Sequence, residues 1–237
     1  MRAYKRIKKL DEVVYDLSKN FNRKIVVADI GTDHGYLAER LSRRGNIEKI
    51  IATDISEKSL DKLNSLIKKE NLKNIETRVG DGLEPIQKVD ISVVAGIGGE
   101  EIISIIKTQN DINFNEKKCN LFVLQPSHNV IELRKWIFKK NIFVVFDKII
   151  YVADRAYSII VIDVSKKQKN KISIQNVYLG RDNKIDDEDF VLAIKDMFES
   201  LKFIDQIPMI KIMFNKSLKE KFKLKKRIEK LLKEKLC

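Results

Sequence analysis

The sequence predicts an α/β fold, in which a mostly parallel sheet with an antiparallel last strand is followed by a small C-terminal α-helical unit. Three observations predict it. Short apolar runs alternate five times with amphipathic stretches of helical period. Two more β-branched runs follow, separated only by Asp154 and Arg155, which indicates an antiparallel pair. After about residue 166, the charged stretch KKQKN opens a part of the chain that is nearly free of strand signals.

Each predicted strand is a short run of β-branched residues, as expected for strands that a parallel sheet buries on both faces. The five parallel strands cover residues 25–30, 49–55, 74–80, 90–96 and 120–126. The antiparallel pair covers residues 142–153 and 156–164. Right-handed crossovers between the parallel strands put the intervening helices on both faces of the sheet.

The predicted helices have apolar residues at helical spacing. They cover residues 4–19, 36–44, 57–69 and 130–140, and a further helix begins near Gly99. A Rossmann-like sheet that ends in an antiparallel pair is the layout of a class I methyltransferase. An NAD-binding Rossmann domain would instead continue the alternation of strands and helices. We therefore expect a methyltransferase-like domain over residues 1–166.

The rest of the chain, residues 167–237, is expected to form a second, helical domain. Residues 187–204 and 207–236 are predicted to be two helices, with Pro208 tolerated near the start of the second. Their apolar stripes favour an antiparallel, coiled-coil-like hairpin. From residue 216 onward, ten basic residues accompany three acidic ones. This excess indicates either a solvated face of a Lys-rich protein or a surface that binds phosphates.

The composition narrows the class of function. The formal net charge is +13 and the pI is about 9.5, which favours a polyanionic partner such as nucleic acid, although an AT-biased genome also produces Lys-rich proteins. No run of about 20 apolar residues is present to span a bilayer, and the N-terminus lacks the apolar core of a signal peptide. Cys119 and Cys237 have no metal-ligand spacing, so we expect free thiols, no metal and no membrane association.

The turn after the first strand, within VVADIGTDHGYL at residues 26–37, carries a functional signal. Dinucleotide-binding turns need G-x-G-x-x-G so that a pyrophosphate can approach a helix, and GTDHG at residues 31–35 does not match. S-adenosylmethionine has no pyrophosphate and carries an ammonium and a sulfonium. Asp29 at the strand end suits that positive ligand, and Gly31 lets the backbone come close. The alternative is a structural turn in which Asp29 only caps a helix.

The next two strands also end in carboxylates. Asp54, which Ile55 follows, can accept hydrogen bonds from both ribose hydroxyls, or can serve as the N-cap of the next helix. Asp81, in the turn GDGL, can accept from the adenine amino group beside a backbone N–H. The alternative is a common Asp-Gly turn with Gly82. We assign Asp54, Ile55, Asp81 and Gly82 to the cofactor site.

The fourth strand ends in a turn with few side chains, Ala95-Gly96-Ile97-Gly98-Gly99. Bare backbone there leaves room for a substrate beside the methyl group, and the alternative is close packing of helix on strand. We assign Ala95 and Gly96 to the cofactor site, and Ile97, Gly98 and Gly99 to the substrate site. Acidic or glycine-rich ends on four successive strands indicate S-adenosylmethionine more specifically than any one of them.

At these residues the sequence resembles a known family. DIGTDHGYL, GDGL, AGIGG and LQPSHN, followed by LRKWI, are similar to the motifs of the bacterial tRNA (adenine(22)-N1)-methyltransferases, the TrmK family. The resemblance covers about residues 4–165 by motif and the C-terminus by layout. It implies a class I methyltransferase domain and a helical, coiled-coil-like domain, which methylate N1 of adenine 22 in the D-loop region of tRNA in the cytoplasm. Asp54 stands where many relatives carry a Glu-containing strand end, and aspartate can bind the ribose in the same way.

The reaction suggests roles for the remaining residues. Adenine N1 is already a nucleophile, so the site must chiefly align it with the methyl group and exclude water. Because the product is a cationic base, we choose Asp33 as the catalytic carboxylate, with a helix N-cap as its alternative. We expect His34 to contact the methionine end of the cofactor or the base, and the alternative is that it makes only a structural hydrogen bond. Asp33 and His34 are also assigned to the cofactor site. Tyr36 covers the site or packs, and Gln125 and Pro126 flank a target base that is extruded from the folded tRNA.

Arg134, within LRKWI, completes the predicted substrate site. We expect tRNA as the partner and a monomer as the active form. Two other classes of function stay open: a non-catalytic RNA-binding module with a methyltransferase fold, and a methyltransferase that acts on another nucleic acid, a protein or a small molecule. The intact strand ends argue against the first class, and the basic helical domain argues against a protein or small-molecule substrate.

Overall fold

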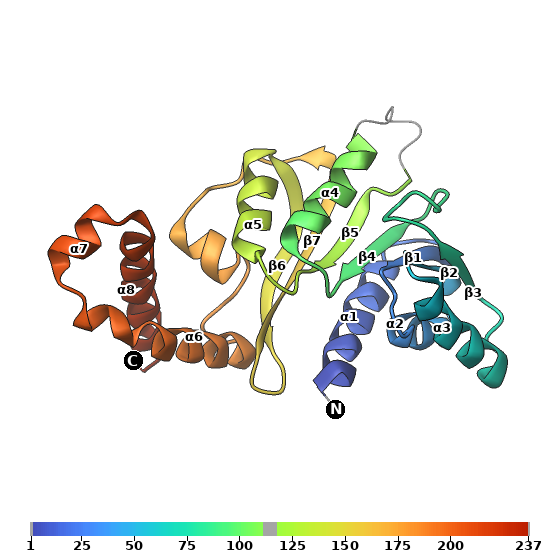
Figure 1. Ribbon diagram of the computed structural model, residues 1–237, viewed down its shortest axis with the longest axis horizontal. Helices are drawn as coiled ribbons and strands as arrows, with labels where there is room; N and C mark the ends of the chain where they lie inside the picture. The colour runs from blue at the N-terminus through green and yellow to red at the C-terminus, as the bar shows by residue number, and fades with distance from the viewer. Residues whose placement is uncertain (1, 111–117, 237) are drawn as a thin grey trace.

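The sheet confirms the predicted mostly parallel architecture with an antiparallel last strand. The computed structural model describes residues 2–110 and 118–236. The described residues form a seven-stranded sheet in the order β3-β2-β1-β4-β5-β7-β6 (Figure 1). The strands are β1 Ile25–Ile30, β2 Ile47–Asp54, β3 Ile75–Val79, β4 Ile91–Ala95, β5 Leu121–Gln125, β6 Ile142–Tyr151 and β7 Ala156–Lys167. β1 to β5 pair in parallel, and β7 lies antiparallel between β5 and β6.

Helices cover both faces of this sheet because successive strand residues point to opposite sides. Val27 and Val93 pack toward the helices α1, α2 and α3, whereas their neighbours Ala28 and Val94 pack toward α4 and α5. The helices are α1 Arg2–Ser18, α2 Tyr36–Ser42, α3 Glu57–Glu70, α4 Gly99–Asn110 and α5 Val130–Lys139. These bounds lie close to the predicted ones, since each helix carries an apolar stripe of helical period.

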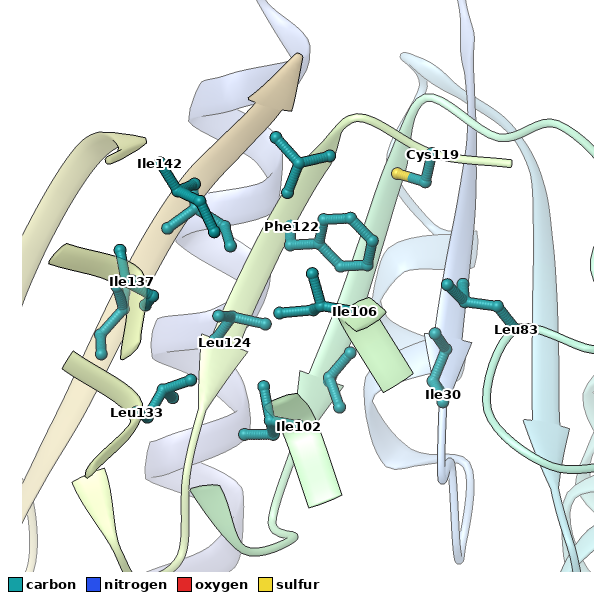
Figure 2. Close-up of a cluster of buried hydrophobic side chains, with 14 of the residues drawn as sticks. Ile30, Leu83, Ile102, Ile106, Cys119, Phe122, Leu124, Leu133, Ile137 and Ile142 are labelled. Carbon is teal, nitrogen blue, oxygen red and sulfur yellow. The ribbon is translucent and has the colours of Figure 1, made fainter. Parts of the chain in front are cut away.

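The core on the α4 and α5 side is the larger of the two clusters that cover the sheet. Figure 2 shows Ile102 and Ile106 of α4 reaching toward Phe122 and Leu124 of β5, with Leu133 of α5 beside them. These side chains are fully buried. Burying an aliphatic or aromatic side chain contributes about 1.5–3 kcal/mol, so this layer holds α4 firmly over the ends of β4 and β5.

The parallel register brings the carboxyl ends of β1 to β5 to one edge of the sheet. Ile30 pairs with both Thr53 and Val94, and Ala95 pairs with Gln125. The loops that follow these strands therefore lie side by side along the edge. The start of α1 and the β6–β7 hairpin lie at the same end of the molecule (Figure 1).

The C-terminal part is helical, as predicted, but its second helix is not continuous. Its elements are the π-helix Gln175–Leu179, α6 Glu188–Ser200, the 3₁₀ helix Lys202–Gln206, α7 Met209–Phe214 and α8 Lys216–Leu236. The predicted helix over 207–236 is wrong at Asn215, whose backbone is extended (φ −111°, ψ 114°). The Asn215 side chain accepts a hydrogen bond from the Leu218 N–H at 3.1 Å, so it caps α8 and ends α7.

A third apolar cluster joins the helical part to the edge strand β6. Ile149 of β6 belongs to the same cluster as Phe190 and Ile194 of α6 and Ile228 of α8. Figure 1 shows this unit beside β6, at the end of the sheet opposite β3. The predicted boundary between residues 166 and 167 falls at the end of β7, within the sheet, and it stays a prediction.

Candidate active site

A cavity of about 1260 Å³ lies at the carboxyl edge of the sheet. The loops after β1, β2, β3 and β4 form its floor, and α1 and α4 contribute its walls. Most of the site residues predicted from the sequence meet there. Those that line it are Asp29, Gly31, Asp33, His34, Tyr36, Asp54, Ile55, Asp81, Gly82, Ala95, Gly96 and Ile97.

The turn between β1 and α2 has the backbone that its glycines allow. Gly31, Asp33 and Gly35 all have positive φ angles, of 69°, 49° and 72°. A Cβ atom on Gly35 would lie 2.4 Å from Cδ1 of Leu63, so only glycine lets α2 start this close to α3. The Thr32 N–H donates to the Thr53 carbonyl at 2.9 Å, which ties the turn to the end of β2.

Asp29 is a buried carboxyl group at the centre of the cavity floor. Its Oδ2 accepts a hydrogen bond from Thr32 Oγ1 at 2.7 Å. Burial raises the pKa of Asp29 from the ordinary 3.8 to about 6, and the neighbouring Asp54 carboxylate adds to this rise. The Ala38 N–H of α2 works in the opposite direction by donating to Asp29 and lowering its pKa. Asp29 therefore accepts a hydrogen bond from the backbone of α2 and offers a negative charge that a cationic ligand would stabilise.

Asp54 is held by the backbone of two loops. Its Oδ2 accepts from the Asp33 N–H at 3.1 Å, and its Oδ1 accepts from the Ser56 N–H at 2.9 Å. The N-cap of α3 is Ser56, whose hydroxyl accepts from the Ser59 N–H, so Asp54 is not that cap. A carboxylate has about four acceptor positions. Two of them stay available to hydroxyl groups of a ligand.

Asp33 and His34 form a pair at the mouth of the cavity. His34 Nδ1 lies 2.7 Å from Asp33 Oδ1, and His34 Nε2 lies 3.2 Å from Lys62 Nζ. The N-cap residue of α2 is Gly35, and no side chain caps this helix, so Asp33 is not its N-cap. The Asp33 side chain is 71% exposed. The Tyr36 ring lies beside His34, with 5.7 Å between the ring centroids.

The far end of the cavity is formed by the loop after β3. Asp81, Gly82 and Leu83 line it, together with Lys118. Lys118 Nζ donates to the carbonyls of Leu83 and Glu84 at 2.8 and 2.7 Å, which fixes the loop. The Asp81 side chain has no ion pair or hydrogen bond within the part of the chain that the structure describes. It stays free to accept from a ligand.

The turn after β4 divides into two halves. Ala95, Gly96 and Ile97 line the cavity, whereas Gly98 and Gly99 pack against the next loop. A Cβ atom on Gly98 would lie 2.1 Å from Glu101 Oε2, and one on Gly99 would lie 2.4 Å from the Asn129 carbonyl. Gly98 and Gly99 therefore allow close packing, which was the alternative to a substrate contact. Glu101, rather than either glycine, lines the cavity.

Gln125, Pro126 and Arg134 do not line the cavity. All three are buried. The Gln125 amide donates to the Pro126 carbonyl at 2.8 Å and accepts from Arg6 Nη1 at 2.7 Å. Gln125 therefore reaches the cavity only through Arg6.

Arg134 makes a buried ion pair with Asp147 on β6, with Nη2 2.8 Å from Oδ1. It also donates to the Ser158 hydroxyl at 2.9 Å and to the Val177 carbonyl at 3.2 Å. Its side chain is only 1% exposed. The structure therefore places Arg134 outside this cavity, where it joins β6, β7 and the following segment.

The residues that form the walls of the cavity were not predicted from the sequence. Arg6 and Ile7 come from α1, and α4 contributes Glu101, Ser104, Ile105 and Thr108. The α4 residues recur at intervals of three and four, so they lie on one helix face. A signal for them therefore exists in the sequence once the helix start near Gly99 is known. Arg6 has no comparable local signal, because the path of α1 across the sheet edge depends on tertiary packing.

Two further features concern ions and membranes. Within residues 2–110 and 118–236, no group of three His, Cys, Asp or Glu side chains is arranged to hold a metal ion. Over the same residues, no helix is both long and apolar enough to cross a membrane.

The known proteins that this chain resembles are methyltransferases. The sequence model of the family described as "Methyltransferase domain" matches residues 5–160. A protein of Mycoplasma genitalium named as a candidate tRNA methyltransferase is 34% identical over 178 residues, which cover 73% of this chain and 77% of that protein. The tRNA (adenine(22)-N(1))-methyltransferase of Bacillus subtilis is 27% identical over 67% of each chain.

A solved structure extends the likeness to nearly the whole chain. The crystal structure of a Streptococcus pneumoniae protein, described as a candidate tRNA (m1A22) methyltransferase, is 27% identical with a TM-score of 0.71, over 94% of this chain and 97% of its own. The same pneumococcal protein in complex with S-adenosyl-L-methionine has a TM-score of 0.74 at 22% identity, over 94% and 98% of the two chains. The chain therefore belongs to the methyltransferase domain family and, within it, to the TrmK family of tRNA methyltransferases.

Proposed function

We propose that this chain transfers a methyl group from S-adenosylmethionine to N1 of adenine 22 in tRNA. The observation that carries the proposal is one cavity in which four successive parallel strand ends present carboxylates or bare backbone. The relatives from B. subtilis and S. pneumoniae, both named for adenine 22, support this substrate. The pneumococcal complex with S-adenosyl-L-methionine supports the cofactor.

The residues of the cavity fit S-adenosylmethionine, which supplies a methyl group on a positively charged sulfur. Asp54 keeps two acceptor positions for the ribose hydroxyls. Asp81 has an unused carboxylate for the adenine amino group at the far end, beside Gly82. Asp29 is buried with a pKa raised to about 6, so a cationic ligand would stabilise its charge. The remaining cofactor residues, Gly31, Ile55, Ala95 and Gly96, supply backbone and apolar walls.

The chain contributes to the chemical step chiefly by holding the acceptor. Adenine N1 attacks with its own lone pair, so alignment and exclusion of water supply most of the rate. The base becomes a cation as the bond forms. We propose that Asp33, held toward His34, stabilises this charge or accepts the amino proton at the mouth of the cavity. Tyr36 and Ile97 are the other proposed acceptor contacts.

The basic α8 is the proposed surface for the tRNA backbone. Its exposed lysines include Lys219, Lys223, Lys226, Lys230 and Lys233, whose spacing of three and four puts them on one side of the helix. Lys225 and Arg227 instead donate hydrogen bonds to Asp205 and Gln175, respectively. We further propose that the enzyme acts as a cytoplasmic monomer, since a single copy contributes all the cofactor-site residues named above.

Direct measurement distinguishes the proposed function from two other functions. A non-catalytic RNA-binding module would need no cofactor, whereas this cavity has free acceptors at Asp54 and Asp81. A methyltransferase for small molecules or proteins would not need the net charge of +13. Calorimetry with S-adenosylhomocysteine, followed by transfer of labelled methyl groups to undermodified total tRNA, tests the proposal. We expect binding and label in tRNA, and an enzyme that binds the cofactor but labels only protein or small molecules contradicts it.

A further inference from the structure

Glu101 is a carboxylate without a partner on the wall of the cavity. It lies in the first turn of α4, is exposed, and lines the cavity. Within residues 2–110 and 118–236, no hydrogen bond or ion pair involves its side chain. The donors and the charge of the cofactor are already matched by Asp29, Asp54 and Asp81. Glu101 is therefore an additional hydrogen-bond acceptor, and it has its own ligand group to find.

The face of α4 that lines the cavity runs from the proposed adenine end of the cofactor site to the opposite end. Ile105 is at the adenine end, because a Cβ atom on Gly82 would lie 3.1 Å from its Cγ1. Glu101 precedes Ile105 by about one helical turn, or about 6 Å along the axis. There, a Cβ atom on Gly98 would overlap Glu101 Oε2 and would lie 2.6 Å from His128 Nε2. Glu101 therefore lies against the turn after β4, away from the adenine end.

The cavity has room for a base at this end. Its volume is about 1260 Å³, and sites for a single small molecule usually have about 300–1,000 Å³. Tyr36 and Ile97, the other proposed contacts of the acceptor base, line the same cavity. Ile97 belongs to the turn against which Glu101 lies. The Glu101 carboxylate therefore borders the space that the proposed function assigns to the target adenine.

A carboxylate beside N1 of the target base would select adenine. A carboxylate accepts hydrogen bonds from N–H groups and repels phosphates and carbonyl oxygens. The amino group next to N1 is the N–H donor of adenine, whereas guanine carries a carbonyl oxygen at that position. As N1 gains the methyl group, positive charge spreads onto the amino group. A charge-assisted hydrogen bond to it is therefore stronger in the transition state than in the bound substrate.

We propose that Glu101 accepts a hydrogen bond from the amino group of the target adenine and thereby determines the specificity for that base. The inference rests on the proposed function, because it needs the target base in this cavity. The N1 lone pair forms the bond to the methyl carbon, the carbon–sulfur bond breaks, and its electron pair stays on sulfur. No proton passes to Glu101. The second N–H bond of the amino group remains available to Asp33 at the mouth of the cavity.

The test pairs a change in the enzyme with a change in the base. Glu101→Met keeps the length of the side chain and removes both carboxylate oxygens. Purine in place of adenine 22 removes the amino group and keeps N1. In single-turnover methylation of the tRNA with adenine 22, Glu101→Met is expected to be about 10- to 100-fold slower than the original chain, as loss of a charge-assisted hydrogen bond implies. On the tRNA with purine at position 22, the two rates should agree within about twofold, because the bond is absent from both.

Glu100→Met is the matched control, because Glu100 is exposed in the same turn of α4 but does not line the cavity. It should change neither rate, and calorimetry should give both variants the S-adenosylhomocysteine affinity of the original chain. Equal slowing of Glu101→Met on the two tRNAs overturns the proposal, as does no slowing on either or a matching loss of cofactor affinity. Failure of the proposed function looks different, because the original chain would then methylate neither tRNA, or would methylate both at another position.

Discussion

Asp29 shows how a single buried residue is held ready for a ligand at a cost to stability. Its pKa is raised from 3.8 to about 6 by burial, so the folded state takes up a proton more readily than the unfolded chain. The contribution of this group to stability is therefore fully present below about pH 4 and is lost as the pH rises to about 6. Above that range the ionised carboxylate costs on the order of 3 kcal/mol.

Asp29→Asn is expected to raise the melting temperature at pH 7 by a few degrees and to weaken binding of S-adenosylmethionine. Asparagine can still accept from Thr32, but it carries no charge to desolvate and none to offer the cationic ligand. At pH 4.5, where Asp29 itself is protonated, the two melting temperatures should converge. Equal melting temperatures at both pH values would show that Asp29 carries no such penalty.

A substitution of Asp33 should change the rate of methyl transfer without changing the affinity for the cofactor. Its carboxylate lies at the mouth of the cavity and bonds His34, and no cap of α2 depends on it. Asp33→Ala should leave the affinity for S-adenosylhomocysteine largely intact and slow single-turnover methylation of tRNA by about 10²-fold or more. A single-turnover rate equal to that of the original chain would remove Asp33 from the catalytic residues.

At the scale of elements, the break at Asn215 turns one predicted helix into two. The periodicity of apolar residues continues through residues 207–236, and for that reason the sequence alone predicts a single helix. The short polar side chain of Asn215 competes by capping α8. α8 then packs against α6 through Leu224, Ile228 and Leu231 and exposes its lysines on the other side.

Charge reversal on α8 tests its proposed role. Lys219 and Lys223 are exposed and make no ion pair within the described residues, so Lys219→Glu with Lys223→Glu should leave the fold intact. We expect weaker tRNA binding and a salt dependence shallower by about one to two units, since each phosphate contact contributes about 0.7–0.9. The matched control reverses Lys139 and Lys140, which are exposed at the end of α5. Identical salt slopes for the two double variants would make α8 a packing element only.

At the scale of the whole molecule, the strands, the helices of the sheet domain and the strand-end residues could be predicted from the sequence because each is a local pattern. Asp29, Asp54 and Asp81 each end or follow a β-branched run, and the parallel topology brings them together. Arg6 and Arg134 could not be placed in this way. Arg6 meets Gln125 across 119 residues, and Arg134 meets Val177 across 43, so their roles depend on tertiary packing.

Arg134 also joins the two parts of the chain, and this predicts a stability effect rather than a substrate effect. Arg134→Met should lower the free energy of unfolding by about 3–5 kcal/mol in a denaturant titration, because Asp147 is left buried without its cation. Adding Asp147→Leu should restore part of the loss. A variant that unfolds like the original chain but binds tRNA more weakly would instead make Arg134 a substrate contact.

The proposed activity is methylation of N1 of one adenine in tRNA by the cofactor bound in this cavity. The most direct measurement incubates the chain with S-adenosylmethionine and an unmodified tRNA transcript, then maps the product by nuclease digestion and mass spectrometry. We expect a single 1-methyladenosine at position 22 and no methylation of a matched transcript in which adenine 22 is replaced by guanine. Methylation at another position, or equal methylation of both transcripts, would contradict it.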